Sequence, residues 1–183
     1  MENILTLNAI SNKIDNVFGI DYTVSDTSSN PVGILVRSFD MHDYDLPSSV
    51  LAVSRAGAGV NNIPVEEYAE KGVVVFNTPG ANANAVCELV ITALLMGSRK
   101  IVKAIDWVKS IKDDENLSKT VEKGKKEFVG QEIFGKKLGV IGLGAIGAKV
   151  ANTAISLGME VLGYDPYLSV INALHISRHV EIT

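Results

Sequence analysis

Three glycines in the last quarter of the chain have the spacing of a loop that binds the pyrophosphate of a dinucleotide. Gly142, Gly144 and Gly147 follow the apolar stretch KKLGVIG, which is typical of a strand, and open a stretch with helical periodicity. Gly142 permits a tight turn, Gly144 lets the backbone approach the phosphates, and Gly147 lets the helix pack closely on the strand. The free N–H groups and the dipole at the start of that helix favour a bound anion.

An acidic residue completes this pattern. Asp165 ends the next strand-like stretch, MEVLGYD, and comes 18 positions after Gly147. Its carboxylate can accept hydrogen bonds from the ribose hydroxyls, whereas a 2′-phosphate would meet like charge. Pro166 and Tyr167 supply no arginine for such a phosphate, so the pattern favours NAD over NADP. We expect cofactor contacts from Gly142, Gly144, Ala145, Ile146, Gly147, Asp165 and Pro166.

The elements around this loop are those of half a dinucleotide-binding sheet. The 47 residues from Lys137 to Thr183 hold one strand–helix–strand unit, a short helical stretch at 169–174 and the start of a third strand in HVEIT. A complete two-halved sheet has about six strands. We therefore expect the first part of a Rossmann domain, and expect the chain to be the N-terminal fragment of a longer protein.

The first 80 residues have the alternation of a parallel α/β sheet. Several apolar runs of strand length are nearly continuous, which is typical of strands buried on both faces. Helix-like stretches lie between them at Ala9–Val17 and at Pro64–Lys71, the second with Pro at its start and Gly72 after its end. The predicted strands are Ile4–Leu7, Ile20–Val24, Gly33–Val36, Val50–Val53 and Val73–Phe76.

Between the two regions the sequence predicts helix and then a polar segment. Apolar residues recur at helical spacing from Val86 to Val108, as one long helix or two abutting ones, with Asn82 and Asn84 as possible caps. Residues 112–132 are the most polar part of the chain. Their lysines could form a phosphate patch, but mixed charge is typical of a solvated connector, and that is the interpretation we adopt.

Composition limits the class of protein. The 183 residues are 46% hydrophobic with a formal net charge of −4, which favours a folded core and gives no basic excess for a nucleic-acid surface. The N-terminus has no basic head before an apolar run, and the apolar stretch at 89–96 is too short to cross a membrane. Cys87 is the single cysteine, so we expect no disulfide and a reducing, cytoplasmic setting.

Several stretches together resemble one family, the D-isomer-specific 2-hydroxyacid dehydrogenases. They are VRS at 36–38, VSRAGAGVNNIPVEEYAEKGVVVFNTPGANANAVCELV at 53–90 and FGKKLGVIGLGAIGAKVANTAISLGMEVLGYDPY at 134–167. The resemblance implies a flavodoxin-like substrate domain, here residues 1–99. It implies an incomplete NAD-binding Rossmann domain at 100–183, with the polar connector at 112–132, and a homodimer.

The resemblance also assigns roles to residues. Arg37 and Ser38 would face a substrate phosphate, which suits the fork of donors on an arginine. The backbone of Gly57, Ala58 and Gly59 would bind the substrate carboxylate and approach the nicotinamide. Asn82 would lie at the cleft, and Ala58 and Val86 would contact the cofactor. From the residues alone, Arg37 could equally be a structural partner at the end of a strand.

The implied reaction is oxidation of the 2-hydroxyl of 3-phospho-D-glycerate by NAD, at the start of L-serine synthesis. The sequence departs from the family at Ala145, where many members have an arginine, and at Asn61, where aspartate is common. The family's catalytic arginine, glutamate and histidine have no counterpart before Thr183, so we assign no catalytic residue and expect an inactive chain. The alternatives are another D-2-hydroxy acid, such as glycerate or lactate, and a non-catalytic NAD-responsive binding module.

Other reactive side chains have weaker support. His175 and His179 are four residues apart, but they lie where a helix gives way to a strand, with no carboxylate to complete a metal site. His42 falls in a polar loop, where we expect it to be solvated. Cys87 falls on an apolar helical face, where an inert buried thiol is expected. We therefore predict no metal site.

Overall fold

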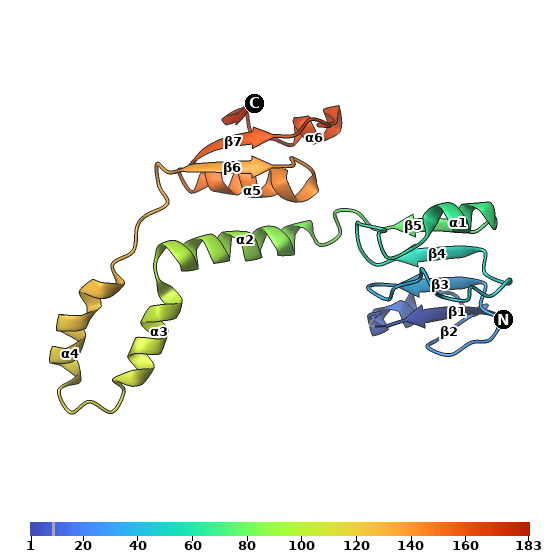
Figure 1. The fold of residues 1–183 in the computed structure, drawn as a ribbon, viewed down its shortest axis with the longest axis horizontal. Helices are drawn as coiled ribbons and strands as arrows, with labels where there is room; N and C mark the ends of the chain where they lie inside the picture. The colour runs from blue at the N-terminus through green and yellow to red at the C-terminus, as the bar shows by residue number, and fades with distance from the viewer. Residues whose placement is uncertain (9) are drawn as a thin grey trace. The chain divides into compact units, whose positions relative to one another are not determined.

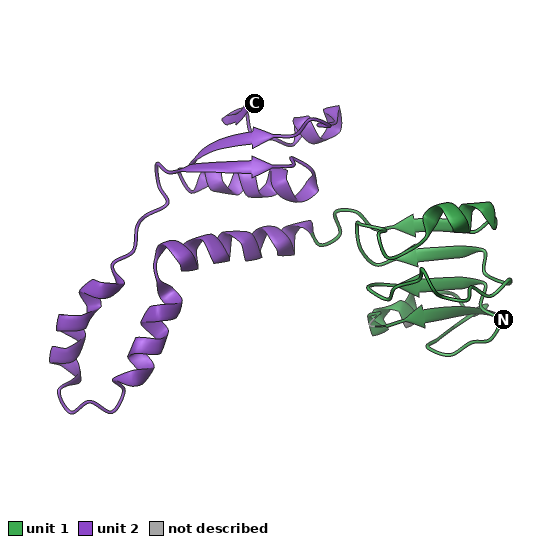
Figure 2. Cartoon of the chain, in the orientation of Figure 1, with its two compact units in different colours: residues 1–82 green, residues 83–183 purple. Residues whose placement is uncertain are grey.

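The structure is a computed structural model that describes residues 1–8 and 10–183. It contains two compact units, residues 1–82 and 83–183, and each has its own parallel sheet (Figure 2). The division between the units precedes the long helix, whereas the sequence placed the end of the substrate domain after it, at residue 99. That domain boundary stays a prediction.

Unit 1 is a five-stranded parallel sheet of the flavodoxin type. The strand order is β2-β1-β3-β4-β5, which is the 2-1-3-4-5 order of flavodoxin-like folds (Figure 1). In such sheets ligands bind beyond the carboxyl ends of the strands where the order reverses, here between β1 and β3. The strands are β1 (Glu2–Leu7), β2 (Tyr22–Ser25), β3 (Gly33–Val36), β4 (Ala52–Arg55) and β5 (Val74–Asn77).

The helical segments of unit 1 are short. Within the predicted helix Ala9–Val17, Ala9 lies outside the described residues, and the rest forms only a 3-10 turn, η1 (Asn12–Asn16), capped by the Ser11 hydroxyl. Asparagine and aspartate in this stretch compete with helix by bonding locally, which explains the shorter element. Helix α1 (Val65–Glu70) follows Pro64 as predicted, and Gly72 after it has a φ of 76°.

Unit 2 begins with three helices. A break at Lys100, which has a left-handed φ of 53°, separates α2 (Ala83–Ser98) from α3 (Ile101–Ser110), so the long apolar stretch forms two abutting helices. The predicted connector contains α4 (Leu117–Gly124) and η2 (Lys125–Phe128). The Trp107 ring of α3 packs on the Phe128 ring of η2, with the ring centroids 4.9 Å apart. This contact joins the two elements.

The rest of unit 2 is a three-stranded parallel sheet in the order β6-β7-β8, with α5 packed on it and against α2 (Figure 1). The Cys87 thiol on α2 lies 3.7 Å from the Thr153 hydroxyl on α5. This is the predicted first half of a Rossmann sheet. The elements are β6 (Lys137–Ile141), α5 (Ala145–Ser156), β7 (Glu160–Tyr164), α6 (Val170–Leu174) and β8 (Val180–Ile182).

Each unit has a separate apolar core. In unit 1 the core includes Val36 and Val53 on neighbouring strands and Tyr68 on α1. In unit 2 it includes Leu143 from the glycine loop and Ala151 from α5. Within the described residues, no helix is both long and apolar enough to span a membrane.

Candidate functional site

The glycine loop of unit 2 joins β6 to α5 and is fixed by its own turn, by a buried side chain and by contacts with the end of β7. Gly142 has a φ of 87°, and its N–H donates to the Tyr164 carbonyl at 2.7 Å. The next side chain, Leu143, is fully buried in the unit 2 core. One turn residue and one buried side chain therefore set the direction in which the loop enters the helix.

Gly144 and Gly147 have the two different roles that the pattern predicts. A Cβ on Gly147 would lie 1.9 Å from the Gly142 carbonyl oxygen, so only glycine lets the helix pack this closely. A Cβ on Gly144 would meet nothing within 4 Å. The space beside Gly144 is open, as the close approach of a pyrophosphate requires.

The start of α5 offers backbone donors to that space. Gly144 is the N-cap and has no side chain to satisfy the first turn, and the first helical bond runs from the Ala148 N–H to the Gly144 carbonyl at 3.0 Å. The first-turn N–H groups of Ala145, Ile146 and Gly147 have no helical acceptor. These residues therefore fit the pyrophosphate of a dinucleotide.

Asp165 directly follows β7, as predicted, and it also holds the glycine loop. One carboxylate oxygen accepts from the Leu143 N–H at 2.8 Å and the other from the Tyr167 N–H at 2.9 Å. Each oxygen can still accept a second hydrogen bond, so ribose hydroxyls remain possible partners. Pro166, beside it, is exposed.

The second glycine loop, Gly57–Gly59 in unit 1, is held by two side chains and one backbone N–H from residues outside it. All three of its carbonyl oxygens have protein donors. The Thr78 N–H donates to Gly57 at 2.9 Å, the Asn77 amide donates to Ala58 at 2.7 Å, and the Arg55 guanidinium donates to Gly59. Among the described residues, the N–H groups of Ala58 and Gly59 have no acceptor, so they remain available to an anion.

Arg55 is a residue that the sequence analysis missed. Its Nε donates to the Arg37 carbonyl at 3.1 Å while its Nη1 donates to the Gly59 carbonyl, so one guanidinium joins the ends of two strands. A Cβ on Gly57 would lie 3.1 Å from this group, and one on Gly59 would lie 3.2 Å from it. The sequence feature that could have identified Arg55 is its position at the end of β4, because residues at the carboxyl ends of parallel strands face the ligand crevice.

A pocket of about 510 Å³ lies at this edge of unit 1. It brings together three of the predicted substrate residues, Arg37, Gly57 and Asn82, from three different segments. Ser38, Ala58 and Gly59 do not line it. The other described residues that line it are Ile10, Ser11, Lys13, Ile14, Val17, Ala56, Thr78 and Ala81.

Ser38 instead contacts the residue that follows β1. The Asn8 side-chain oxygen accepts from the Ser38 hydroxyl at 3.2 Å and from the Phe39 N–H at 2.7 Å. Asn8 has a left-handed φ of 55°, a conformation that asparagine tolerates better than most residues. This contact joins the ends of β1 and β3, the two strands between which the order of the sheet reverses.

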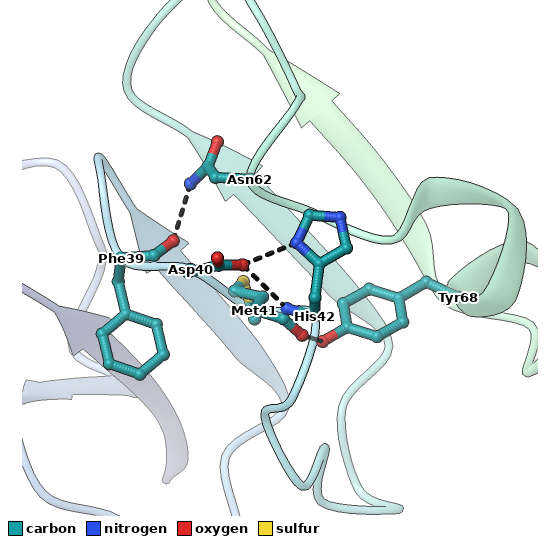
Figure 3. A network of polar contacts seen from close by, with 6 residues as sticks. All are labelled: Phe39, Asp40, Met41, His42, Asn62 and Tyr68. Atoms are coloured by element: carbon teal, nitrogen blue, oxygen red, sulfur yellow. Dashed lines mark hydrogen bonds and ion pairs between the residues drawn. The ribbon is translucent and has the colours of Figure 1, made fainter.

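A polar network continues from there and fixes the segment after Arg37 (Figure 3). The Asn62 amide donates to the Phe39 carbonyl at 2.7 Å, and the Tyr68 hydroxyl donates to the Met41 carbonyl at 3.3 Å. The His42 Nδ1–H donates to the exposed Asp40 carboxylate at 2.6 Å, and this hydrogen bond lowers the pKa of Asp40. The network therefore supports the pocket from outside, and His42 does not line it.

The remaining candidates do not form a site. Val86 is half-buried on α2 in unit 2. His175 ends α6, and its carbonyl accepts from the Asn152 amide at 2.7 Å. In the part of the chain that the structure describes, no three His, Cys, Asp or Glu side chains are grouped to hold a metal ion.

Comparisons with known proteins identify related sequences and a related fold. Residues 91–181 match the family described as D-isomer specific 2-hydroxyacid dehydrogenase, NAD binding domain. The chain is 42% identical over 116 residues to a D-3-phosphoglycerate dehydrogenase of Methanocaldococcus jannaschii, covering 63% of the chain and 20% of that protein. It is 41% identical over 114 residues to a hydroxypyruvate reductase of Thermotoga maritima, covering 62% and 34%.

A solved structure extends the similarity to the whole chain. The D-lactate dehydrogenase of Aquifex aeolicus, complexed with NAD and lactic acid, superposes with a TM-score of 0.74 at 19% identity, covering all of this chain and 56% of that one. The chain thus spans between a fifth and a third of the two curated relatives. The predicted fold, family and NAD cofactor are confirmed: the chain belongs to the D-isomer-specific 2-hydroxyacid dehydrogenases.

Proposed function

We propose that this protein oxidises the 2-hydroxyl of 3-phospho-D-glycerate with NAD as the hydride acceptor, in L-serine synthesis. The observation that carries the proposal is the pocket lined by both Arg37 and Gly57, next to a loop whose Ala58 and Gly59 N–H groups have no acceptor among the described residues. An arginine suits a phosphate and backbone N–H groups suit a carboxylate, so the two ends of a phosphorylated hydroxy acid have matching partners.

The roles of the chain's own residues follow from that assignment. Arg37 and Ser38 hold the phosphate end, the Gly57–Gly59 loop holds the carboxylate, and Asn82 borders the same pocket. Gly142 to Gly147, with Asp165 and Pro166, hold the dinucleotide, and Ala58 and Val86 are assigned to cofactor binding as well. NAD, when bound, supplies the acceptor for the hydride.

The test exchanges the phosphate for a hydroxyl on the substrate. In the active enzyme, Arg37→Ala should lower kcat/KM for 3-phospho-D-glycerate at least about thirtyfold, because a charged hydrogen-bond partner is lost. The loss for D-glycerate should be much smaller. Equal losses for both substrates would show that Arg37 does not bind the phosphate.

We also propose that the 183 residues alone do not catalyse the reaction. The described residues that line the Arg37 pocket include no histidine, the commonest general base, and no carboxylate; Lys13 is their one side chain of the usual general-base types. A turnover assay on the chain should give no NADH that depends on 3-phospho-D-glycerate. Robust turnover would overturn this proposal.

A second candidate is an unphosphorylated substrate of the same reaction class. The similarity to a hydroxypyruvate reductase is nearly as high as that to a phosphoglycerate dehydrogenase, and this favours it. A higher kcat/KM for D-glycerate or lactate than for 3-phospho-D-glycerate would select it.

We further propose a cytoplasmic homodimer. Apolar side chains on one stretch of α3 support the dimer, because Val102 and Val108 are more than half exposed and Ile105 is 45% exposed. The free, buried Cys87 suits a reducing compartment. A monomeric mass at micromolar concentration would contradict the dimer.

A further inference from the structure

The basic residues of unit 1 are unevenly placed. Residues 1–82 contain ten acidic and four basic side chains, a formal net charge of −6. Lys71 is paired with Glu67 on α1 at 2.7 Å. The other three, Lys13, Arg37 and Arg55, are all at the edge where the strands end, and two of them line one pocket. Two cations, Lys13 and Arg37, line one pocket of an otherwise acidic unit, and this placement favours the binding of an anion in that pocket.

We propose that Lys13 is a second phosphate-binding residue, which acts with Arg37 on the phosphate of the substrate. This inference rests on the proposed function. A phosphate monoester carries close to two negative charges at neutral pH, and one arginine balances only one of them. Arg55 cannot supply the second charge freely, because its guanidinium already donates to the Arg37 and Gly59 carbonyls.

The local structure gives Lys13 a defined place at the pocket. It is in η1, which the Ser11 hydroxyl caps by accepting from the Lys13 N–H at 3.4 Å. Ser11 and Ile14, on either side of it, also line the pocket. In the described residues no carboxylate pairs with the Lys13 ammonium, and none lines the pocket. Among the described side chains, a nearby phosphate therefore has no carboxylate to compete with for this lysine.

The position of η1 explains why the lysine can act with Arg37. η1 follows β1, and Arg37 follows β3, and these strands are neighbours in the sheet. The two cations therefore come from the two sides of the switch point, where open α/β sheets bind their ligands. The apolar Ile14 and Val17 in the same pocket reduce its polarity, which strengthens attraction to a charge.

The test measures binding of 3-phospho-D-glycerate and D-glycerate to the protein by calorimetry. Lys13→Gln should weaken 3-phospho-D-glycerate about tenfold and change D-glycerate less than about twofold, because only the phosphate contact is lost. Lys13→Arg should restore most of the affinity. Lys71→Gln is the matched control, since it removes one positive charge from the same unit away from the pocket, and it should leave both affinities unchanged.

The outcomes separate this inference from the proposed function. If Arg37→Ala weakens 3-phospho-D-glycerate but Lys13→Gln does not, the Lys13 assignment is wrong and the proposed function stands. Equal weakening of both ligands by Lys13→Gln would also overturn the assignment, because η1 would then only support the pocket. If the phosphorylated acid binds no better than D-glycerate to the unaltered protein, both proposals fail.

Discussion

The two glycine loops of this chain present backbone N–H groups in different ways. The loop Gly142–Gly147 is fixed by its own backbone, by the buried Leu143 and by the strand next to it. The loop Gly57–Gly59 is fixed by the side chains of Arg55 and Asn77 and by the backbone N–H of Thr78. Both loops therefore depend on the end of the neighbouring strand, but the cofactor loop is also anchored by a side chain of its own in the core, whereas the carbonyl oxygens of the substrate loop are held by donors outside it.

The largest expected effect is a loss of stability where Gly147 packs against the Gly142 carbonyl in the cofactor loop. Gly147→Ala should destabilise unit 2 by about 2–3 kcal/mol, because the new methyl group would overlap the Gly142 carbonyl. Chemical denaturation that resolves the two units should show loss in unit 2 alone. Equal loss in both units would contradict the separation of their cores.

Gly144→Ala is the matched comparison for that variant. Its methyl group meets no atom of the protein, so stability should change by less than about 1 kcal/mol. NAD affinity should nevertheless fall strongly, because the methyl group would occupy the space left for the pyrophosphate. Unchanged NAD affinity, measured by calorimetry, would remove Gly144 from the cofactor site.

Arg55→Gln tests the substrate loop in the same manner. It removes donors to the Arg37 and Gly59 carbonyls, and we expect a loss of about 1–2 kcal/mol in unit 1. Amide exchange should rise at Gly57 and Thr78, whose N–H groups are hydrogen-bonded at this loop, and remain unchanged at residues 142–147. Arg55→Lys keeps the charge but not the fork, so a full rescue by lysine would show that charge alone matters.

Ala145→Arg tests whether an added positive charge at the cofactor loop strengthens NAD binding. The side chain is exposed at the start of α5, where an added cation would lie near the pyrophosphate. NAD affinity should rise about two- to fivefold at low salt, and the gain should shrink at high salt. A gain that does not depend on salt would argue against a direct charge effect.

The smallest expected effect is on the titration of Asp114, which lies between α3 and α4. Hydrogen bonds from the Thr120 hydroxyl and the Asn116 N–H, each 2.7 Å, lower the pKa of the Asp114 carboxyl below its usual 3.8. The two hydrogen bonds therefore stabilise the folded state fully above the usual Asp pKa of 3.8, and this contribution is lost as the pH falls through the lowered pKa of Asp114. Thr120→Val should raise the midpoint of the Asp114 carboxyl carbon, followed by NMR. An unmoved midpoint would exclude the hydroxyl as a cause.

The two loops also differ in how well they could be predicted from the sequence. The cofactor loop, its strands and Asp165 were predicted because the glycines and the aspartate have the spacing of a known strand–helix–strand pattern. Arg55 was missed because its partners, Arg37 and Gly59, meet it only after the strands pair. Ser38 was assigned to the substrate by resemblance, and its contact with Asn8 depends on the turn after β1. No pattern of residues marks such contacts between strands.

The most direct test of the account is an NMR titration of the chain with NAD and with NADP. We predict that NAD shifts the amide signals of residues 142–147 and of Asp165 and Tyr167, with weaker binding of NADP because Asp165 would repel its 2′-phosphate. The largest shifts should be those of the Ala145, Ile146 and Gly147 amides, since their N–H groups have no helical acceptor and would meet the pyrophosphate. Shifts confined to other residues, or tighter binding of NADP, would contradict the account.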